Sequence, residues 1–187
     1  HRFRRGYKNV INEAIRLNNE GIYCPLAIET SGHAAIKENY FLDDGAYLVT
    51  RLLIKMAQLK REGKKLEDLL EGLAEPVESR EFRMNITCED FKAYGQKIID
   101  ELTEHSMTAP GWHCAPDNRE GIRASFDKGD GDGWFLLRLS VHDPLMPLNI
   151  ESDSVGGVHQ IAQKLYDFLK KYENLDTAPL EKRLLQR

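Results

Sequence analysis

The sequence has few cysteines, no long apolar run and no excess of positive charge, and each absence excludes a class of protein. Its three cysteines, Cys24, Cys88 and Cys114, are widely spaced, so they predict neither a disulfide framework nor a structural zinc site. No segment approaches the roughly 18 consecutive apolar residues of a membrane-spanning helix, and no signal peptide is visible. The formal net charge of -4 is unlike that of most nucleic-acid-binding domains. We therefore expect no nucleic-acid partner, no membrane partner and a cytoplasmic location.

The composition is that of a globular protein, and Pro76 divides the chain into two parts. With 187 residues, 41% of them hydrophobic and 30% charged, the chain can form one large domain or two small ones. In residues 1–76 a helix over 9–19 precedes short strands over 22–28 and 34–37, and a long helix is predicted over 45–61. Its buried stripe is expected to contain Leu48, Leu52, Met56 and Leu59. This pattern predicts a partial α/β domain.

Residues 77–187 have a different pattern, with more strands and fewer helices. Strands are predicted over 81–87, 121–126, 134–139 and 148–151, and helices from a cap at Thr87 to about His105 and over 157–172. The order predicts an α+β domain with helices on one face of a mainly antiparallel sheet. The charged tail from Asn174 onward is expected to be loose.

Two short segments carry side chains suited to a polar ligand. Arg138-Leu-Ser140-Val141-His142-Asp143-Pro144 leaves the end of a predicted strand, and Arg138 and Ser140 alternate along it and so share one side. A guanidinium, a hydroxyl and the amides of a tight turn together suit a phosphate dianion. A second segment, Glu29-Thr-Ser31-Gly-His33, places a carboxylate, a hydroxyl and an imidazole on one turn. Each segment alone is as well explained by an ordinary exposed turn.

Taken in order, these segments resemble motifs of the α-D-phosphohexomutase family, which includes phosphoglucomutases and phosphomannomutases. The resemblance is carried by the following pieces: Gly6-Tyr7-Lys8 as the glycine-aromatic-basic loop, Glu29-x-Ser31-Gly-His33 as the sugar-recognition motif, Asp43-Asp44-Gly45 as the opening of the next helix, and Arg138-x-Ser140-x-x-x-Pro144 as the phosphate loop, with Glu151 beyond it. It covers most of the chain. The pieces match the third and fourth domains of a four-domain family.

The resemblance implies a role for each matched residue. Residues 1–76 would be a partial sugar-binding domain and residues 77–187 the C-terminal phosphate-binding domain. Glu29 and Ser31 would hydrogen-bond the ring hydroxyls of the sugar, with His33 nearby and Lys8 facing the substrate. Arg138 and Ser140, with the backbone around Val141 and His142, would hold the phosphate that is not transferred. The family loop reads Arg-x-Ser-Gly/Asn-Thr-Glu-Pro, so Val141, His142 and Asp143 depart from it.

The catalytic parts of the family are missing from this sequence. No Ser-His-Asn-Pro motif, which carries the phosphoserine, is present, and Asp130-Gly-Asp132-Gly133 only imitates the metal loop Asp-Gly-Asp-Gly-Asp-Arg. That string is predicted to be a hairpin turn. We expect a truncated chain whose parent interconverts hexose 1-phosphate and hexose 6-phosphate with Mg²⁺, with a hexose 1,6-bisphosphate as activator.

Three expectations follow from the truncation, and two alternatives to it remain open. The chain alone is predicted to lack mutase activity, to depend on N-terminal domains of the same protein and to self-associate through its uncovered apolar surface. One alternative is a non-catalytic sugar-phosphate-binding module with a genuine terminus at His1. The other is a structural domain whose motif matches are accidental.

Overall fold

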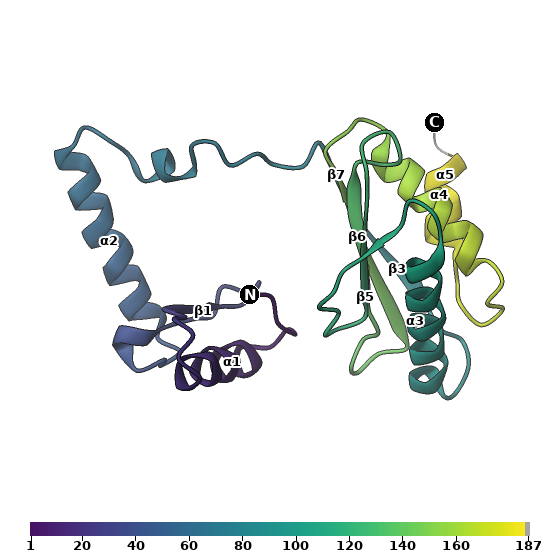
Figure 1. Cartoon of the computed structure of the whole chain (residues 1–187), viewed down its shortest axis with the longest axis horizontal. Helices are drawn as coiled ribbons and strands as arrows, with labels where there is room; N and C mark the ends of the chain where they lie inside the picture. Colours follow the sequence, from purple (N-terminus) through teal and green to yellow (C-terminus); the bar gives the residue numbers. More distant parts are fainter. Residues whose placement is uncertain (186–187) are drawn as a thin grey trace. The chain divides into compact units, whose positions relative to one another are not determined.

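The computed structural model describes residues 1–185, and the chain divides into two compact units (Figure 1). The first unit is formed by His1–Ala74 and the second begins at Glu75. The candidate segment Glu29–His33 lies in the first unit, and the candidate segment Arg138–Pro144 lies in the second.

The first unit contains a small two-stranded sheet, with one long helix before it and one after it in the sequence. Its elements are α1 (Tyr7–Asn19), β1 (Leu26–Ile28), β2 (Ala34–Ile36), the 3₁₀ turn η1 (Lys37–Asn39), α2 (Gly45–Arg61) and the 3₁₀ turn η2 (Leu66–Leu70). Strands β1 and β2 are antiparallel, with Ala27 opposite Ala35. These two alanines and Ala14 of α1 form a small core, and their short side chains allow the helix to lie close to the sheet. The predicted strand over 22–28 is correct only for its last three residues.

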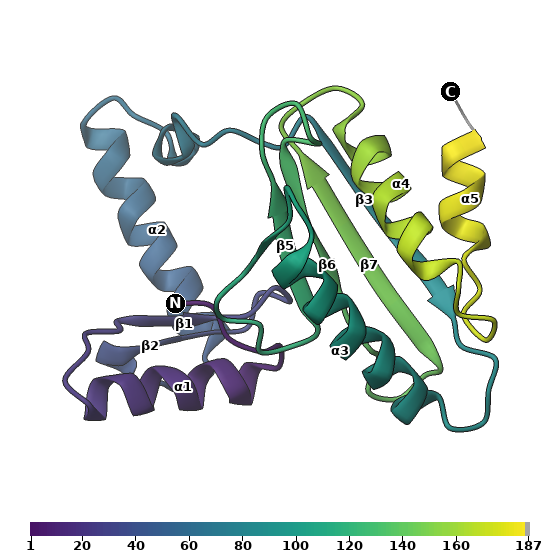
Figure 2. The same ribbon diagram turned by 45° about the vertical axis from the view of Figure 1, so that its right-hand side comes forward.

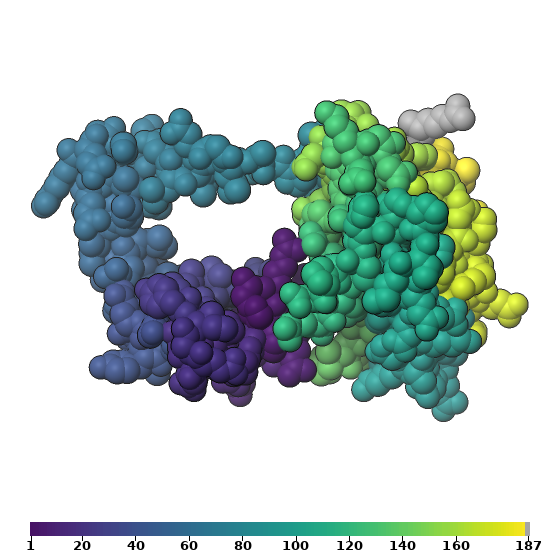
Figure 3. Space-filling model, in the orientation of Figure 1, coloured from purple at the N-terminus to yellow at the C-terminus, as the bar shows by residue number. Residues whose placement is uncertain are grey.

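Helix α2 has the predicted bounds but not the predicted burial. It begins after Asp44, whose carboxylate accepts the backbone N–H of Tyr47 at 3.0 Å. Of the predicted stripe only Leu59 is buried, whereas Leu52 and Met56 are each 46% exposed. The prediction of a buried stripe was therefore wrong for the described residues. Figure 3 shows α2 and the segment after it as a narrow strip, and within this unit α2 packs mainly against β2 and η2.

The second unit is a five-stranded antiparallel sheet with three helices. Its elements are β3 (Glu78–Asn85), α3 (Phe91–Thr108), β4 (His113–Cys114), β5 (Ile122–Phe126), β6 (Gly133–Leu137), β7 (Leu145–Ser152), α4 (Gly157–Leu169) and α5 (Ala178–Leu185). The strand order is β3-β7-β6-β5-β4, and every neighbouring pair is antiparallel. Figures 1 and 2 show the helices on one side of the sheet. The predicted α+β class and the helices on one face are confirmed.

The core of the second unit lies between the sheet and the helices. Alternate residues of the strands point into it, as Phe82 and Met84 do on β3 and as Phe135 and Leu137 do on β6. The intervening residues of these strands therefore lie on the opposite, helix-free face of the sheet. That face includes Glu81 and Arg83 of β3.

Three details of this unit correct the predictions. The cap of α3 is Asp90, which accepts the N–H of Ala93 at 3.1 Å, whereas the Thr87 hydroxyl donates to the carbonyl of Asn174. A short strand, β4, lies between α3 and β5, where the sequence predicts no strand. The tail is not loose up to residue 185: it forms α5, whose Leu180 is completely buried in the core. The few apolar residues of this helix, among them Leu180 and Leu184, stand in a short charged segment and provide too weak a periodic signal to predict it.

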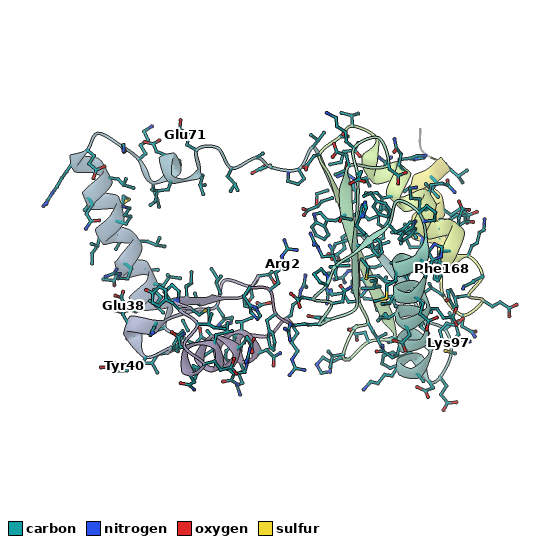
Figure 4. All side chains as sticks on the ribbon, viewed as in Figure 1. Arg2, Glu38, Tyr40, Glu71, Lys97 and Phe168 are labelled. Atoms are coloured by element: carbon teal, nitrogen blue, oxygen red, sulfur yellow. The ribbon has the colours of Figure 1, made fainter. Side chains whose placement is uncertain are left out.

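The burial of His105 should make the second unit less stable at mildly acidic pH. Its ring lies 5.0 Å from the rings of both Trp112 and Phe168, and Figure 4 shows Phe168 on the helix side of the sheet. Burial, and then the charge of Lys171, lower the pKa of His105 below its ordinary value. Since the unfolded chain then binds a proton more readily than the folded one, the free energy of unfolding should fall as the pH drops below about 6.5. Urea unfolding of wild type and His105→Gln at several pH values tests this: the variant should show a shallower pH slope, and an equal slope would contradict the assignment.

Candidate functional site

The turn after β1 holds an ionised glutamate. Glu29 accepts the backbone N–H of Ser31 at 2.7 Å and the hydroxyl of Thr30 at 2.9 Å. The N–H of Glu29 donates to the carbonyl of His33 at 2.9 Å and closes the turn. The hydrogen bonds from Ser31, followed by that from Thr30 and the charge of Arg5, lower the pKa of Glu29 to about 2. At neutral pH this carboxylate can therefore only accept hydrogen bonds, so it suits a ligand that carries hydrogen-bond donors.

His33, at the end of this turn, is held between an acid and an aromatic ring. Its Nδ1 lies 2.8 Å from Oδ2 of Asp43, and its ring stacks on that of Tyr7 with centroids 5.0 Å apart. The ammonium of Lys8 lies 5.9 Å from the centroid of the same Tyr7 ring. Tyr7 and Lys8, predicted to lie in a loop, form the first turn of α1 after the cap at Gly6. The first unit thus brings the start of α1 together with the turn of Glu29, Ser31 and His33.

The second candidate segment is the hairpin loop between β6 and β7. Hydrogen bonds from Arg138 N–H to Pro147 O at 3.0 Å and from Ser140 N–H to Leu145 O at 2.9 Å extend the β6–β7 ladder up to the loop. Because Leu137 faces the core, Arg138 and Ser140 both lie on the helix-free face, as the sequence predicts. The amide of Asp143 donates to the Ser140 hydroxyl at 3.3 Å. Val141 and His142 lie exposed at the tip of the loop.

Two glycines allow other segments to pack closely against residues 137–139, beside Arg138 and Ser140. A Cβ at Gly95 of α3 would lie 2.5 Å from Cδ1 of Leu139, so the absence of a side chain lets Leu139 pack on the helix. Gly121 has φ +73, and a Cβ there would lie 2.0 Å from the carbonyl oxygen of Leu137. The segment before β5 therefore runs directly against β6.

The close approach at Gly121 gives Arg138 an acidic neighbour. Oε1 of Glu120 lies 3.5 Å from Nη1 of Arg138, whose side chain is only 15% exposed. On the same face, Arg83 Nε donates to Glu81 at 2.7 Å. The hydrogen bond from Arg83, then the one from Asn149 and the charges of Arg83 and Arg138, lower the pKa of Glu81. No local pattern predicts Glu120 as a neighbour of Arg138, because this contact depends on how the segment before β5 lies against β6.

The Asp130–Gly133 string lies in the turn between β5 and β6, which confirms the predicted hairpin. Asp130 pairs with Lys164 at 2.7 Å and Asp132 accepts the hydroxyl of Ser154. Within residues 1–185, no group of three His, Cys, Asp or Glu side chains could hold a metal ion. Across the same described part of the chain, no helix has both the length and the apolar character needed to cross a bilayer.

Known proteins support the assignment that these two segments suggest. Residues 1–77 match the family described as phosphoglucomutase/phosphomannomutase, alpha/beta/alpha domain III. A phosphomannomutase/phosphoglucomutase of Pseudomonas syringae is 30% identical over 148 residues, which are 78% of this chain and 29% of that protein. A phosphoglucomutase of Neisseria meningitidis is 26% identical over 151 residues, 80% of this chain and 30% of that protein.

A solved structure agrees with these sequence matches. The crystal structure of a phosphoglucomutase/phosphomannomutase family protein from Burkholderia thailandensis superposes with a TM-score of 0.63 at 26% identity, covering 91% of this chain and 32% of that one. Over most of its length the chain is therefore similar to members of the phosphohexomutase family. Within that family, its residues 1–77 correspond to domain III. The chain spans about three tenths of the length of the curated relatives it matches.

Proposed function

We propose that the chain is the C-terminal, substrate-binding part of a phosphohexomutase that interconverts hexose 1-phosphate and hexose 6-phosphate. Glucose and mannose phosphates are the proposed substrates, and the reaction would pass through a phosphoserine and a bisphosphorylated sugar. The names of the relatives, which are phosphoglucomutases and phosphomannomutases, support this reaction class. The observation that carries the proposal is the match of residues 1–77 to domain III, because these residues form the turn with the ionised Glu29.

Each proposed contact follows from the chemistry of the side chain. Glu29, an acceptor only, suits the donating hydroxyls of a sugar, and the Ser31 hydroxyl can donate or accept. Lys8 is proposed to face the substrate beside this turn. Arg138 and Ser140, with the amides around Val141 and His142, would hold the phosphate that stays on the sugar. Fixing both ends of the sugar orients its reactive oxygen and supplies binding energy away from the reacting centre.

Phosphoryl transfer also needs groups that this set of residues does not provide. In the parent enzyme, Mg²⁺ would neutralise the charge on the transferred phosphoryl group, and a phosphoserine would donate it. The described residues contain no cluster that fits a metal ion, and the roles proposed for the chain are binding and orientation of the substrate. We accordingly propose that the isolated chain is inactive, that it acts with N-terminal domains of the same protein and that a hexose 1,6-bisphosphate activates the parent. Self-association of the isolated chain is proposed through the exposed apolar side chains of α2.

Calorimetry with glucose 1-phosphate and mannose 1-phosphate tests the binding role on the 187-residue chain. Glu29→Gln should weaken binding by roughly 10-fold or more, because hydrogen bonds to charged groups contribute about 1.5–3 kcal/mol. The matched control is Glu67→Gln, an exposed glutamate of η2 that should leave the affinity unchanged. Absence of binding to either sugar phosphate, or equal effects of the two variants, would contradict the proposal. Isomerisation by the purified chain would refute its inactivity.

A further inference from the structure

Asp43 and Tyr7 hold the ring of His33 from two directions, and neither residue binds the sugar in the proposed function. We propose that Asp43 and Tyr7 are positioning residues that fix the tautomer and the orientation of His33, so that its Nε2 presents a hydrogen-bond acceptor to a hydroxyl of the sugar phosphate. The identity of the ligand rests on the proposed function. The state of the imidazole does not, and it can be measured without any ligand.

The backbone places Asp43 beside His33. Asp43 forms an isolated antiparallel bridge with Ala35 of β2, and His33 lies two residues before Ala35. His33 and Asp43 are therefore diagonal neighbours across this bridge, a separation that long side chains can span. The following residue, Asp44, serves as the helix cap, so the Asp43 carboxylate remains available for the imidazole.

The contact at Nδ1 determines which nitrogen of the neutral ring carries the proton. An ionised carboxylate can only accept hydrogen bonds, so at 2.8 Å from Oδ2 of Asp43 the Nδ1 atom must donate. In the neutral imidazole the other nitrogen, Nε2, then has no proton and carries a lone pair. Nε2 lies on the far side of the ring from Asp43, and His33 is half exposed, so this acceptor can reach a ligand from solvent. It would complement the hydroxyl group of a sugar, which can donate to it.

Tyr7 restricts the remaining motion of the imidazole. The two rings are nearly parallel, 24° apart, with centroids 5.0 Å from each other. The hydrogen bond between Nδ1 and Asp43 alone would still allow the imidazole plane to tilt. The stacked ring of Tyr7 limits that tilt. Tyr7 is the first residue of α1, so its backbone is fixed by the helix. Together the carboxylate and the ring define both the proton position and the plane of His33.

Nitrogen NMR of the ¹⁵N-histidine-labelled 187-residue chain tests the inference directly. Long-range ¹H–¹⁵N spectra above the histidine titration range distinguish the two neutral tautomers. Wild-type His33 should be in the Nδ1–H form, and Asp43→Ala should shift it mainly to the Nε2–H form. The matched control is Asp127→Ala, since Asp127 contacts His113 through Nε2 at 2.9 Å. That variant should change the signals of His113 and leave those of His33 unchanged.

Ligand titration separates the positioning role from the binding role. Adding glucose 1-phosphate should shift the Nε2 signal of wild-type His33, and Asp43→Ala and Tyr7→Ala should each weaken the affinity by several-fold. Tyr7→Phe, which keeps the stacked ring, should restore it. If Asp43→Ala fails to fold, Asp43→Leu, which has a similar shape and no hydrogen-bond acceptor, takes its place. An Nε2–H tautomer in the wild type, or a tautomer unaffected by the loss of Asp43, overturns the inference. A correct tautomer with no response to glucose 1-phosphate overturns the role toward the sugar while leaving the assignment of Asp43 in place.

Discussion

Arg138→Ala is expected to weaken the binding of glucose 1-phosphate by the chain roughly 10- to 100-fold, the range given by about 1.5–3 kcal/mol for hydrogen bonds to a charged group. A guanidinium donates two hydrogen bonds in a plane that matches a phosphate, and none of the hydroxyls and amides beside it carries a charge. Arg138 is also the positive partner of Glu120 at 3.5 Å. Its removal would leave that carboxylate beside an incoming phosphate, which adds repulsion to the lost attraction.

The measurement is isothermal titration calorimetry, with urea unfolding to verify that the variant is folded. Arg138→Lys should retain part of the affinity, because it keeps the charge but loses the paired donors. Arg80→Ala is the matched control: Arg80 is an exposed arginine of β3 whose Nη1 donates to the neighbouring Ser79 carbonyl. An Arg138→Ala variant that binds glucose 1-phosphate like the wild type would contradict the assigned phosphate loop.

Phe135→Ala is expected to lower the free energy of unfolding of the second unit by about 3–5 kcal/mol, the usual cost of removing a buried phenylalanine. Phe135 is completely buried on β6, and its ring contacts those of Trp112 at 5.7 Å and Phe126 at 6.1 Å between centroids. Its loss leaves a cavity between the sheet and the helices. The cavity cannot close easily, because the neighbouring rings of Trp112 and Phe126 are held by other segments of the chain.

Tryptophan fluorescence during urea unfolding measures this effect on the second unit alone. The chain has two tryptophans, Trp112 and Trp134, and both lie in that unit. The control is Leu136→Ala, the next residue of the same strand, which lies half-buried on the helix-free face. It should cost clearly less than Phe135→Ala. Equal losses would show that the helix side of the sheet is not the core.

The sequence predicted those parts of the fold that depend on local periodicity. The alternation of Phe82 and Met84 on β3 and the bounds of α2 follow from patterns of two and 3.6 residues. The same pattern could not predict that Leu52 would be exposed. A helical stripe shows which face is apolar, whereas its burial depends on what other segments are present to cover it.

The candidate site was predictable where its residues stand next to each other in the chain. Glu29, Ser31 and His33 share one turn, and Arg138 and Ser140 share one strand end, so short motifs contain them. Their partners come from other elements. Asp43 reaches His33 through a bridge to β2, and Glu120 reaches Arg138 because Gly121 allows two strands to approach closely. Such contacts need tertiary register, which no local pattern contains.

The packing of Leu139 on Gly95 connects the segment from Arg138 to Pro144 with α3, on the helix-covered face of the sheet. Leu139 stands between Arg138 and Ser140, and its methyl groups occupy the space that any side chain at residue 95 would need. A larger residue there would push the strand end outward and separate Arg138 from Ser140, the two residues proposed to bind the phosphate. A mutational screen for altered sugar-phosphate affinity should therefore recover substitutions along α3, remote from the ligand, as well as changes in the loop itself.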